Sequence, residues 1–439
     1  MITRSVDALV IGGGSAGLAA ALELREGGAT VAVVEREPFL GGILLQCIHS
    51  GFGLHEFGED LTGPEYAERF IRPALAAGIE IYLDATVTEI GEIPAGGEGA
   101  RTVIALSRGM GVIRFTARAV VLAMGCRERN RGNVAIAGTR PAGVFTAGLA
   151  QRLVNIEGYV PGKSAVIIGS GDIGLIMARR LTLVGCEVRA VVEIQSWPSG
   201  NARNIAQCLN DHSIPLHLGH VVTRIEGRDR VEAVRVAPLS PEGEAMSERE
   251  LRIPCDTVLL SVGLIPENEL SRAAGVPINE GTGGPWVDAD YMTGARGIFA
   301  CGNVLHVHDL VDFVTEEARL CAAQAAQFLA GSPAEASLRV TAGANVRSIV
   351  PNACVPGRQT VFTLRSLVVK NDARLIVRVG GQEVRARRLS HVQPSEMIRF
   401  VMKAGEITAS AAGPASAAGP APMAGSPSAT GPAVEVSLR

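Results

Sequence analysis

The chain has 439 residues, 47% of them hydrophobic and 52 of them glycine, and its formal net charge is −3. This length suits two or three domains of about 100–200 residues each, and so small a charge excludes a general attraction to nucleic acid or to an anionic membrane. No apolar run reaches the roughly 18 residues that cross a bilayer. The N-terminal apolar run is short and leads directly into glycines, unlike a signal peptide. A cytoplasmic protein without a membrane span is therefore expected.

The first recognisable unit covers residues 6–35 and has the order strand, glycine turn, helix, strand. An apolar run over residues 6–11 predicts a buried strand, and the alanine- and leucine-rich residues 18–25 predict a helix. A second apolar strand ends at Glu35. Residues 79–122 are rich in β-branched side chains, which predicts a meander followed by one more core strand.

The same order returns in the middle of the chain. Residues 165–168 predict a strand, residues 175–184 a helix and residues 187–193 the next strand. Further strand-rich segments follow. A late strand that ends within residues 297–303 then precedes an alanine-rich helix over residues 315–329. A second unit that interrupts the first one explains this return.

Both units carry the spacing G-x-G-x-x-G between the first strand and the helix. In the first unit Gly12 permits the tight turn, Gly14 lets the backbone approach a pyrophosphate, and Gly17 lets the helix pack on the strand. The phosphates of a dinucleotide bind at the positive N-terminus of such a helix. Glu35 follows about 20 residues later, where a carboxylate accepts hydrogen bonds from a ribose.

Gly169, Gly171 and Gly174 repeat this arrangement, and Glu193 closes the second strand of the second unit. Two copies in one chain predict two bound dinucleotides. A carboxylate at Glu193 would accept from a free 2′-hydroxyl and repel a 2′-phosphate. The second site is therefore expected to prefer NAD(H) over NADP(H).

These patterns predict an α/β protein with two Rossmann-like dinucleotide-binding domains, the second inserted in the first. The expected boundaries are residues 1–150 and 266–335 for the first domain and residues 151–265 for the inserted one. Alternating apolar and polar residues predict a small antiparallel β module over residues 340–404. Residues 405–439 are nearly all Ala, Gly, Pro and Ser, which predicts a disordered tail.

Residues 5–330 resemble the pyridine nucleotide–disulfide oxidoreductase superfamily, in which the first unit holds FAD and the inserted unit holds NAD(P)H. Residues 121–125 are similar to the family's A-T-G turn, residues 261–268 to its V-G-x-x-P-N element and residues 297–303 to its second FAD motif. That motif normally ends in an aspartate that contacts the ribityl chain of the flavin, and Asn303 implies a weaker contact. The resemblance implies FAD and NAD as cofactors and adds cofactor-binding positions at Ser15, Gly42, Val87, Gly125, Gly263, Gly302 and Asn303.

The departures from the superfamily concern its redox cysteines. Glutathione-type reductases carry C-x4-C after a G-G turn, whereas here Cys47 is present and Gly42 occupies the position of the first cysteine. No two of the eight cysteines show C-x-x-C spacing either, so reduced thiols are expected. Residues 41–53 resemble a branch associated with glycerol-3-phosphate-dehydrogenase-like flavoproteins, which implies an electron-transfer partner.

Cys47 and His49 are the candidate catalytic residues. If the family topology holds, Cys47 lies near the flavin, where it either forms an adduct, a sulfenic acid or a mixed disulfide or packs as an inert buried thiol. His49 and His55 either carry protons to a reduced flavin or are ordinary surface histidines.

No metal site is expected from the sequence. Four ligand-type side chains stand close together at His306, His308, Asp309 and Asp312, but their spacing fits no standard ligand pattern.

The residues and the resemblance together predict an FAD-dependent NAD(H) oxidoreductase that transfers hydride between nicotinamide and flavin. It is expected to accept electrons from NADH or return them, to work with a partner dehydrogenase or electron-transfer subunit, and to form a homo- or hetero-oligomer. Two alternatives stay open. One is a stand-alone NADH oxidase or peroxidase that uses Cys47, and the other is a non-catalytic subunit that keeps the nucleotide folds for assembly.

Overall fold

The computed structural model describes residues 1–92, 99–332, 337–407 and 433–439. The chain separates into two compact units. The first contains Met1–Cys126 and Pro266–Arg439, and the second is the insertion Arg127–Ile265. The insertion begins earlier than the predicted residue 151, because strands β10 (Ala137–Gly138) and β11 (Val144–Thr146) pair with strands of the second unit. The chain passes from one unit to the other in the strands β9 (Cys126–Glu128) and β19 (Leu264–Pro266), and these two strands pair with each other.

The large sheet of the first unit has the order β5-β2-β1-β8-β7-β6, with β20 paired to β8. The four neighbours β5, β2, β1 and β8 run parallel, as does β20 beside β8, whereas β7 and β6 continue as antiparallel hairpins. Its strands are β1 (Ile2–Ile11), β2 (Val31–Val34), β5 (Glu80–Tyr82), β6 (Ala85–Glu92), β7 (Arg101–Ser107), β8 (Gly111–Leu122) and β20 (Ile298–Ala300).

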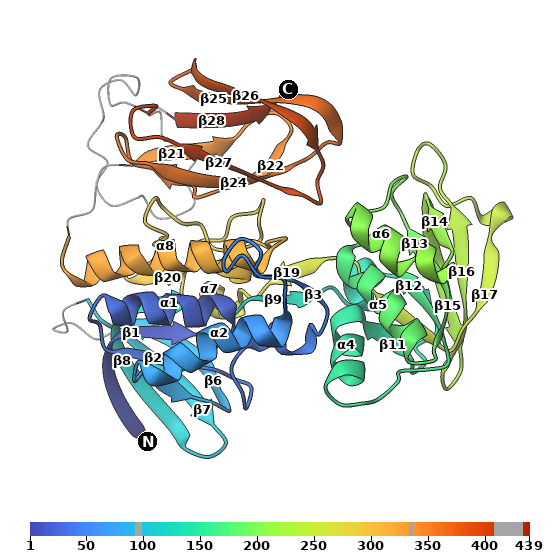
Figure 1. Cartoon of the computed structure of the whole chain (residues 1–439), viewed down its shortest axis with the longest axis horizontal. Helices are drawn as coiled ribbons and strands as arrows, with labels where there is room; N and C mark the ends of the chain where they lie inside the picture. The colour runs from blue at the N-terminus through green and yellow to red at the C-terminus, as the bar shows by residue number, and fades with distance from the viewer. Residues whose placement is uncertain (93–98, 333–336, 408–432) are drawn as a thin grey trace. The chain divides into compact units, whose positions relative to one another are not determined.

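Helices cover the buried parallel strands of this sheet. All four residues of β2 are buried, which explains its unbroken apolar sequence. Helices α1 (Ser15–Glu26) and α8 (Val311–Leu329) lie side by side, and α2 (Gly63–Ala76) packs on α1 (Figure 1). The smaller elements are η1 (Gly42–Gln46), β3 (Ser50–Phe52), β4 (Leu61–Thr62), α7 (Glu269–Ala273) and η4 (Gly302–Val304).

The second unit is built on a parallel sheet with the order β11-β18-β12-β13-β14 and a second sheet with the order β10-β15-β16-β17. A hydrophobic core lies on each side of the parallel sheet. The other elements of this unit are α3 (Arg131–Val134), α4 (Ala147–Asn155), β12 (Ser164–Ile168), α5 (Asp172–Leu183), β13 (Glu187–Glu193), α6 (Ala202–Cys208), η2 (Asn210–His212), β14 (Leu216–Leu218), β15 (His220–Gly227), β16 (Val231–Pro238), η3 (Ser247–Arg249), β17 (Leu251–Pro254) and β18 (Thr257–Leu260).

The β module contains two sheets that share one core. The orders are β23-β21-β28-β25-β26 and β22-β24-β27, and Phe362 of one sheet stacks on Phe400 beside it at 5.3 Å between ring centroids. The strands are β21 (Leu338–Ala342), β22 (Val346–Val350), β23 (Ala353–Cys354), β24 (Thr360–Ser366), β25 (Lys370–Val379), β26 (Gln382–Val392), β27 (Met397–Met402) and β28 (Ala433–Leu438).

The prediction of a disordered tail over residues 405–439 is wrong for β28. This strand lies between β21 and β25, and Val434, Val436 and Leu438 are almost completely buried. The alternating pattern of these three residues is a strand signal that the composition of the whole segment hides. Residues 408–432, which the same prediction covers, lie outside the described residues.

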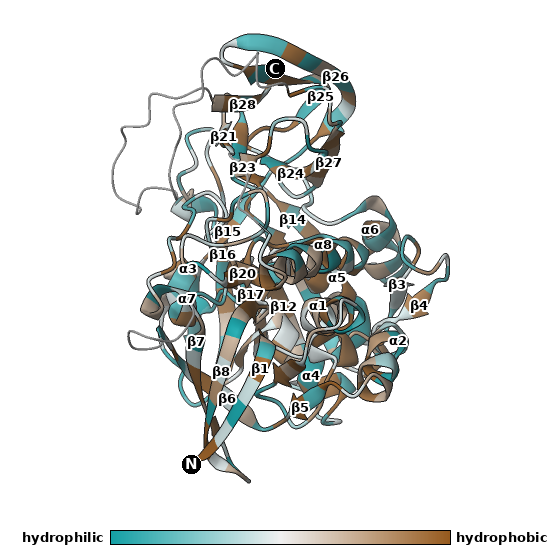
Figure 2. Ribbon diagram, turned by 90° about the vertical axis from the view of Figure 1, so that its left-hand side faces the viewer, coloured by the Kyte–Doolittle hydropathy of each residue, from teal (hydrophilic) through white to brown (hydrophobic). Residues whose placement is uncertain are grey.

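The outer strand β26 carries charges along an open sheet edge. Most of its residues are exposed, including Arg387 and Arg388, and Figure 2 shows hydrophilic residues along much of the strand. Charged side chains on an edge strand oppose pairing with a further chain. Within the described ranges, no helix combines the length and the apolar character needed to cross a bilayer.

Because Val436 is fully buried between β21 and β25, its truncation tests the role of β28. We expect Val436→Ala to lower the free energy of unfolding by about 2 kcal/mol, since the methyl groups leave a cavity in the core of the β module. Glu435→Gln on the same strand is the control and should change stability by less than about 0.5 kcal/mol. Chemical denaturation of the two variants measures this difference, and equal stabilities would contradict the placement of β28.

Candidate dinucleotide-binding sites

The first glycine turn joins β1 to α1 through contacts that only glycine permits. A Cβ on Gly12 would lie 2.4 Å from the carbonyl oxygen of Ala123, and Gly12 has a φ of +109°. A Cβ on Gly17 would lie 1.8 Å from the carbonyl oxygen of Gly12. A larger residue at Gly17 would push the helix away from the strand, and one at Gly12 would collide with the backbone that follows β8. The turn therefore requires both glycines for its own geometry.

Gly14 is different, because the protein leaves the space beside it open. It has a φ of −80° and is the N-cap of α1. A Cβ there would meet nothing closer than the Cα of Gly42 at 3.9 Å. Gly14 has no side chain to cap the first N–H groups of α1, beginning near Ser15, so these groups are available to an anion. This is the geometry that a pyrophosphate needs.

The carboxylate of Glu35 is held beside this turn. Its Oε2 accepts from the backbone N–H of Gly13 at 2.6 Å, and its Oε1 accepts from that of Glu37 at 2.9 Å. An ionised carboxylate has about four acceptor sites, so two remain for ribose hydroxyls. The N–H of Ala85, at the start of β6, donates to the carbonyl oxygen of Glu35 at 3.0 Å, and Val87 follows on the same strand.

The second FAD motif lies against the first turn of α1. Gly302 has a φ of +72°, and a Cβ there would lie 2.7 Å from the Cβ of Ala16. The Oδ1 of Asn303 accepts from the backbone N–H of His308 at 3.0 Å, and its Nδ2 donates to Cys126 Sγ at 3.7 Å. The amide thus makes a donor contact that the family's aspartate could not make. Gly125, the residue before Cys126, has a φ of +72° and open space beside it.

The second glycine turn, in the inserted unit, has the same arrangement of two crowded glycines and one open glycine. A Cβ on Gly169 would lie 2.1 Å from the carbonyl oxygen of Ser261, and one on Gly174 would lie 2.7 Å from the carbonyl oxygen of Gly169. Gly171, the N-cap of α5, has a φ of −65°, and a Cβ there would meet only Ser261 Oγ at 3.8 Å. The protein again leaves the middle glycine open. Gly263 has a φ of +98°.

Glu193 is buried and accepts hydrogen bonds on both oxygens. Its Oε2 accepts from the backbone N–H of Ser170 at 2.9 Å, from Ser170 Oγ at 2.6 Å and from Ser199 Oγ at 3.2 Å. Its Oε1 accepts from the backbone N–H of Gln195 at 2.9 Å. Sequence reasoning missed Ser170 and Ser199. Ser170 stands at the variable position after Gly169, where its hydroxyl was the available signal, whereas Ser199 is brought in by the loop after β13.

Cys47 is a buried thiol at the end of η1. Its Sγ donates to the carbonyl oxygen of Ile43 at 3.3 Å, and burial raises the pKa of the thiol to about 12. Cys47 therefore stays protonated at neutral pH, and a thiol is a far weaker nucleophile than a thiolate. His49 is half-buried, and its Nδ1 lies 3.0 Å from the carbonyl oxygen of Ser50. Their catalytic roles stay predictions.

Asp309 and Asp312, which stand close to His306 and His308 in the sequence, bind other segments near the start of α8. Asp312 accepts from the backbone N–H groups of Gly53, His55 and Glu56, at 3.3, 3.2 and 2.8 Å. Asp309 forms an ion pair with Arg365 of the β module and accepts from the N–H of Met397 at 2.6 Å. These two carboxylates are thus committed to joining segments of the first unit.

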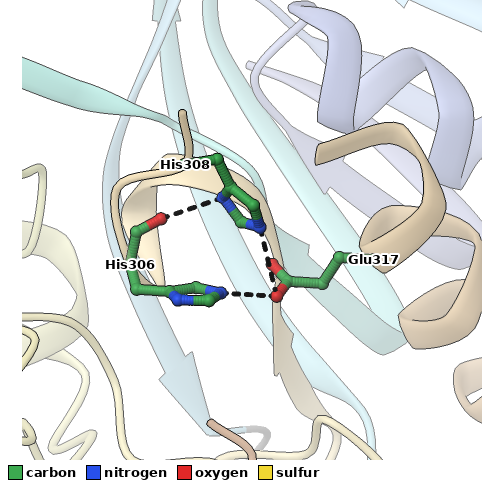
Figure 3. Close-up of side chains that lie close together, drawn as sticks. All are labelled: His306, His308 and Glu317. Carbon is green, nitrogen blue, oxygen red and sulfur yellow. Dashed lines mark hydrogen bonds and ion pairs between the residues drawn. The ribbon is translucent and has the colours of Figure 1, made fainter. Parts of the chain in front are cut away.

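His306 and His308 converge instead on Glu317 of α8, a residue that the sequence did not single out (Figure 3). His306 Nε2 lies 2.6 Å from Glu317 Oε2, and His308 Nε2 lies 3.4 Å from the same oxygen. The backbone N–H of Gly302 donates to Glu317 Oε1 at 2.7 Å. Burial alone would raise the pKa of Glu317, but the neighbouring His306 holds it below its usual range.

The open middle glycines give a test that separates cofactor binding from folding. Both accept alanine in their backbone conformation, so we expect Gly14→Ala and Gly171→Ala to fold. The added methyl group then occupies ligand space at a cost of about 1–3 kcal/mol, which is roughly tenfold or more in affinity. Gly171→Ala should keep its flavin absorbance and lose NADH affinity, whereas Gly14→Ala should lose flavin. Normal binding of both cofactors to both variants would contradict the assignment.

Comparison with known proteins agrees with this geometry. The family model described as pyridine nucleotide-disulphide oxidoreductase matches residues 6–328. Hydrogen cyanide synthase subunit HcnB of Pseudomonas protegens is 26% identical over 69% of this chain and 65% of its own length. An opine oxidase subunit of Agrobacterium tumefaciens is 30% identical over 68% of this chain and 61% of its own length. The chain thus spans less than two thirds of these curated relatives.

Solved structures share the fold. Thioredoxin reductase of T. acidophilum superposes with a TM-score of 0.61 at 21% identity, over 74% of this chain and 99% of that chain. An NAD-dependent persulfide reductase of A. fulgidus covers 90% of this chain and 71% of its own, with a TM-score of 0.55 at 20% identity. The association with glycerol-3-phosphate-dehydrogenase-like proteins stays a prediction. With the family motifs matched and both glycine turns open beside their middle glycine (the two glycine cradles), the chain belongs to the pyridine nucleotide-disulphide oxidoreductase family.

Proposed function

We propose that this chain transfers electrons between NAD(H) and a partner subunit through FAD. Two observations together carry the proposal. Both glycine turns are open beside their middle glycine, and Gly42 stands where a second cysteine would accompany Cys47. The cradles suit two dinucleotides, while the local dithiol that would pass electrons to a disulfide substrate is missing. Electrons that reach the flavin therefore need another acceptor.

The names of three relatives favour a partner. The Pseudomonas and Agrobacterium proteins are both described as subunits, of a hydrogen cyanide synthase and an opine oxidase. A third, of Paraburkholderia xenovorans, is described as the ferredoxin–NAD(+) reductase component of a biphenyl dioxygenase system and is 33% identical over 42% of this chain. We extend this working arrangement to the present chain. The acceptor would then be a partner dehydrogenase or an electron carrier, in a homo- or hetero-oligomer.

Each part of the mechanism assigns a task to residues of the chain. The N–H groups at the start of α1, past Gly14, would hold the FAD pyrophosphate, Glu35 would accept from its ribose, and Asn303 would contact its ribityl chain. The N–H groups at the start of α5, past Gly171, would hold the NAD pyrophosphate. When bound, the cofactors supply hydride transfer between nicotinamide C4 and flavin N5. The protein contributes orientation and the exclusion of side reactions.

We further propose NAD(H) rather than NADP(H) as the nicotinamide cofactor. The carboxylate of Glu193 is fixed in place by Ser170, Ser199 and the N–H of Gln195, so it stays at the end of β13. A 2′-phosphate would meet this carboxylate at the buried end of β13. The cytoplasmic location inferred from composition stays a prediction.

Both alternatives lose support from particular residues. A peroxidase or oxidase would need a reactive thiolate, and the raised pKa of Cys47 opposes one at neutral pH. A non-catalytic assembly subunit would have no need for open space beside Gly14 and Gly171, where an ordinary side chain fits the backbone.

The central experiment is an anaerobic titration of the purified yellow protein with NADH. We expect the flavin band to bleach in proportion to NADH, and an artificial dye to be reduced with little consumption of oxygen. A colourless protein, or a flavin that NADH does not bleach, would overturn the redox proposal. Rapid oxygen consumption without a partner would favour the oxidase instead.

Cofactor choice is tested by comparing NADH with NADPH as reductants. We expect NADH to be preferred in kcat/KM by about tenfold or more, since about 1.4 kcal/mol of charge repulsion suffices for that factor. Glu193→Ala should reduce the preference, because the repelling carboxylate is gone. Glu187→Ala, at the exposed start of the same strand, is the control and should keep the preference. An equal preference in wild type and Glu193→Ala would contradict the role of Glu193.

Cys47→Ser distinguishes electron transfer from thiol chemistry. Since the thiol is buried and protonated, we expect the variant to keep NADH–dye activity within about twofold, a change smaller than about 0.5 kcal/mol in the barrier. A peroxidase that depends on Cys47 would lose its peroxide reaction in this variant. Loss of NADH-dependent activity with intact flavin content would show that the thiol takes part in the chemistry.

A further inference from the structure

A buried cluster of His306, His308 and Glu317, here the His–Glu cluster, has no role in the function proposed above. The two histidines follow η4, and Glu317 lies on the second turn of α8 (Figure 3). Their side chains are 8%, 1% and 6% exposed, and their ligand atoms lie within 4.8 Å of one another. Three polar groups of this kind are costly to bury unless each is compensated.

The contact between His308 Nε2 and Glu317 Oε2 has no hydrogen atom to share when the His308 ring is neutral. His308 Nδ1 lies 3.1 Å from the carbonyl oxygen of His306, which can only accept, so Nδ1 carries the hydrogen. In the neutral ring Nε2 then presents a lone pair. This buried nitrogen makes no hydrogen bond within the described part of the chain, yet it lies 3.4 Å from Glu317 Oε2, another acceptor. Two acceptors that face each other in a buried site call for a cation between them.

The surrounding contacts orient the ligand atoms toward a common point. The carbonyl oxygen of His306 fixes the ring of His308, and the N–H of Gly302 fixes Glu317 through its other oxygen, at 2.7 Å. Glu317 Oε2 and His308 Nε2 stay turned toward each other as a result, and His306 Nε2 lies 2.6 Å from the same carboxylate oxygen. Ligands of protein metal sites are held in this way, by a hydrogen bond from the atom that does not bind the metal.

We infer that the His–Glu cluster binds a divalent transition-metal ion, with zinc as the best match, through His306 Nε2, His308 Nε2 and Glu317 Oε2. Two imidazoles and one carboxylate are ligands that Zn²⁺ accepts, whereas Ca²⁺ and Mg²⁺ prefer oxygen atoms. Bonds of about 2.0–2.2 Å place tetrahedral ligands about 3.3 Å apart. The distances of 2.6 and 3.4 Å from Glu317 Oε2 lie within about 1 Å of that value, a shift that small side-chain rotations supply.

The bound ion would stabilise the second FAD motif. It would join α8 to the segment that directly follows η4, and η4 itself carries Gly302 and Asn303. Asn303 is already tied to this segment through the N–H of His308. Three protein ligands leave one tetrahedral position for water. The assigned role is structural, and it predicts a metal-dependent rise in stability.

The test measures zinc content and thermal stability of the full chain, purified without a histidine tag, stripped with a chelator and then incubated with Zn²⁺. We expect about one zinc per chain and a higher Tm in the wild type, as for structural zinc sites. His308→Asn should lose both effects. The exposed His391, which contacts Asn371, gives the control His391→Asn, which should behave as the wild type.

The inference would be overturned if the wild type and His308→Asn had equal zinc content and an equal Tm response. It would also be overturned if the wild type bound no zinc, because a proton shared within the cluster would then explain the contact. If His308→Asn does not fold, Co²⁺ added to the stripped wild type decides the question. Intense d–d bands beyond the flavin absorbance, typical of tetrahedral coordination, would support the site. Their absence would exclude it.

Discussion

The structure depends on one repeated constraint, the contact of a helix N-terminus with the strand before it at a distance that excludes a Cβ. In the first unit this contact joins Gly17 to the carbonyl oxygen of Gly12, and in the inserted unit it joins Gly174 to that of Gly169. Each turn aims the first N–H groups of its helix at an open space. The close packing of α1 on β1 and of α5 on β12, and with it the position of each helix N-terminus, follows from these two contacts.

Sequence reasoning found the α/β fold and both cradles, because the glycine spacing and the apolar runs are local signals. The partners that fix Glu193 were less accessible. Ser170 stands inside the motif, but Ser199 reaches the carboxylate only through the loop after β13. Glu317 was missed for the same reason, since nothing local shows that one turn of α8 faces His306 and His308.

Two predictions were wrong, the disordered tail over the whole of residues 405–439 and the start of the inserted unit. The segment over residues 405–439 was judged as a whole, and its alanine, glycine and proline content hid the alternation of Val434, Val436 and Leu438. The predicted start of the inserted unit, residue 151, lies after β10 and β11, which belong to that unit. Short strands such as β10 have too few residues to show a period, so their pairing with β15 is a tertiary fact.

The position of β28 has a consequence for folding during synthesis. Of the five strands in its sheet it is the last to be translated, yet it pairs with both β21 and β25 in the interior. Until it leaves the ribosome, those two strands have no shared neighbour, and their unpaired edges are open to other nascent chains. Chaperone binding to the β module would thus be concentrated in this interval, whereas the nucleotide-binding units can close earlier.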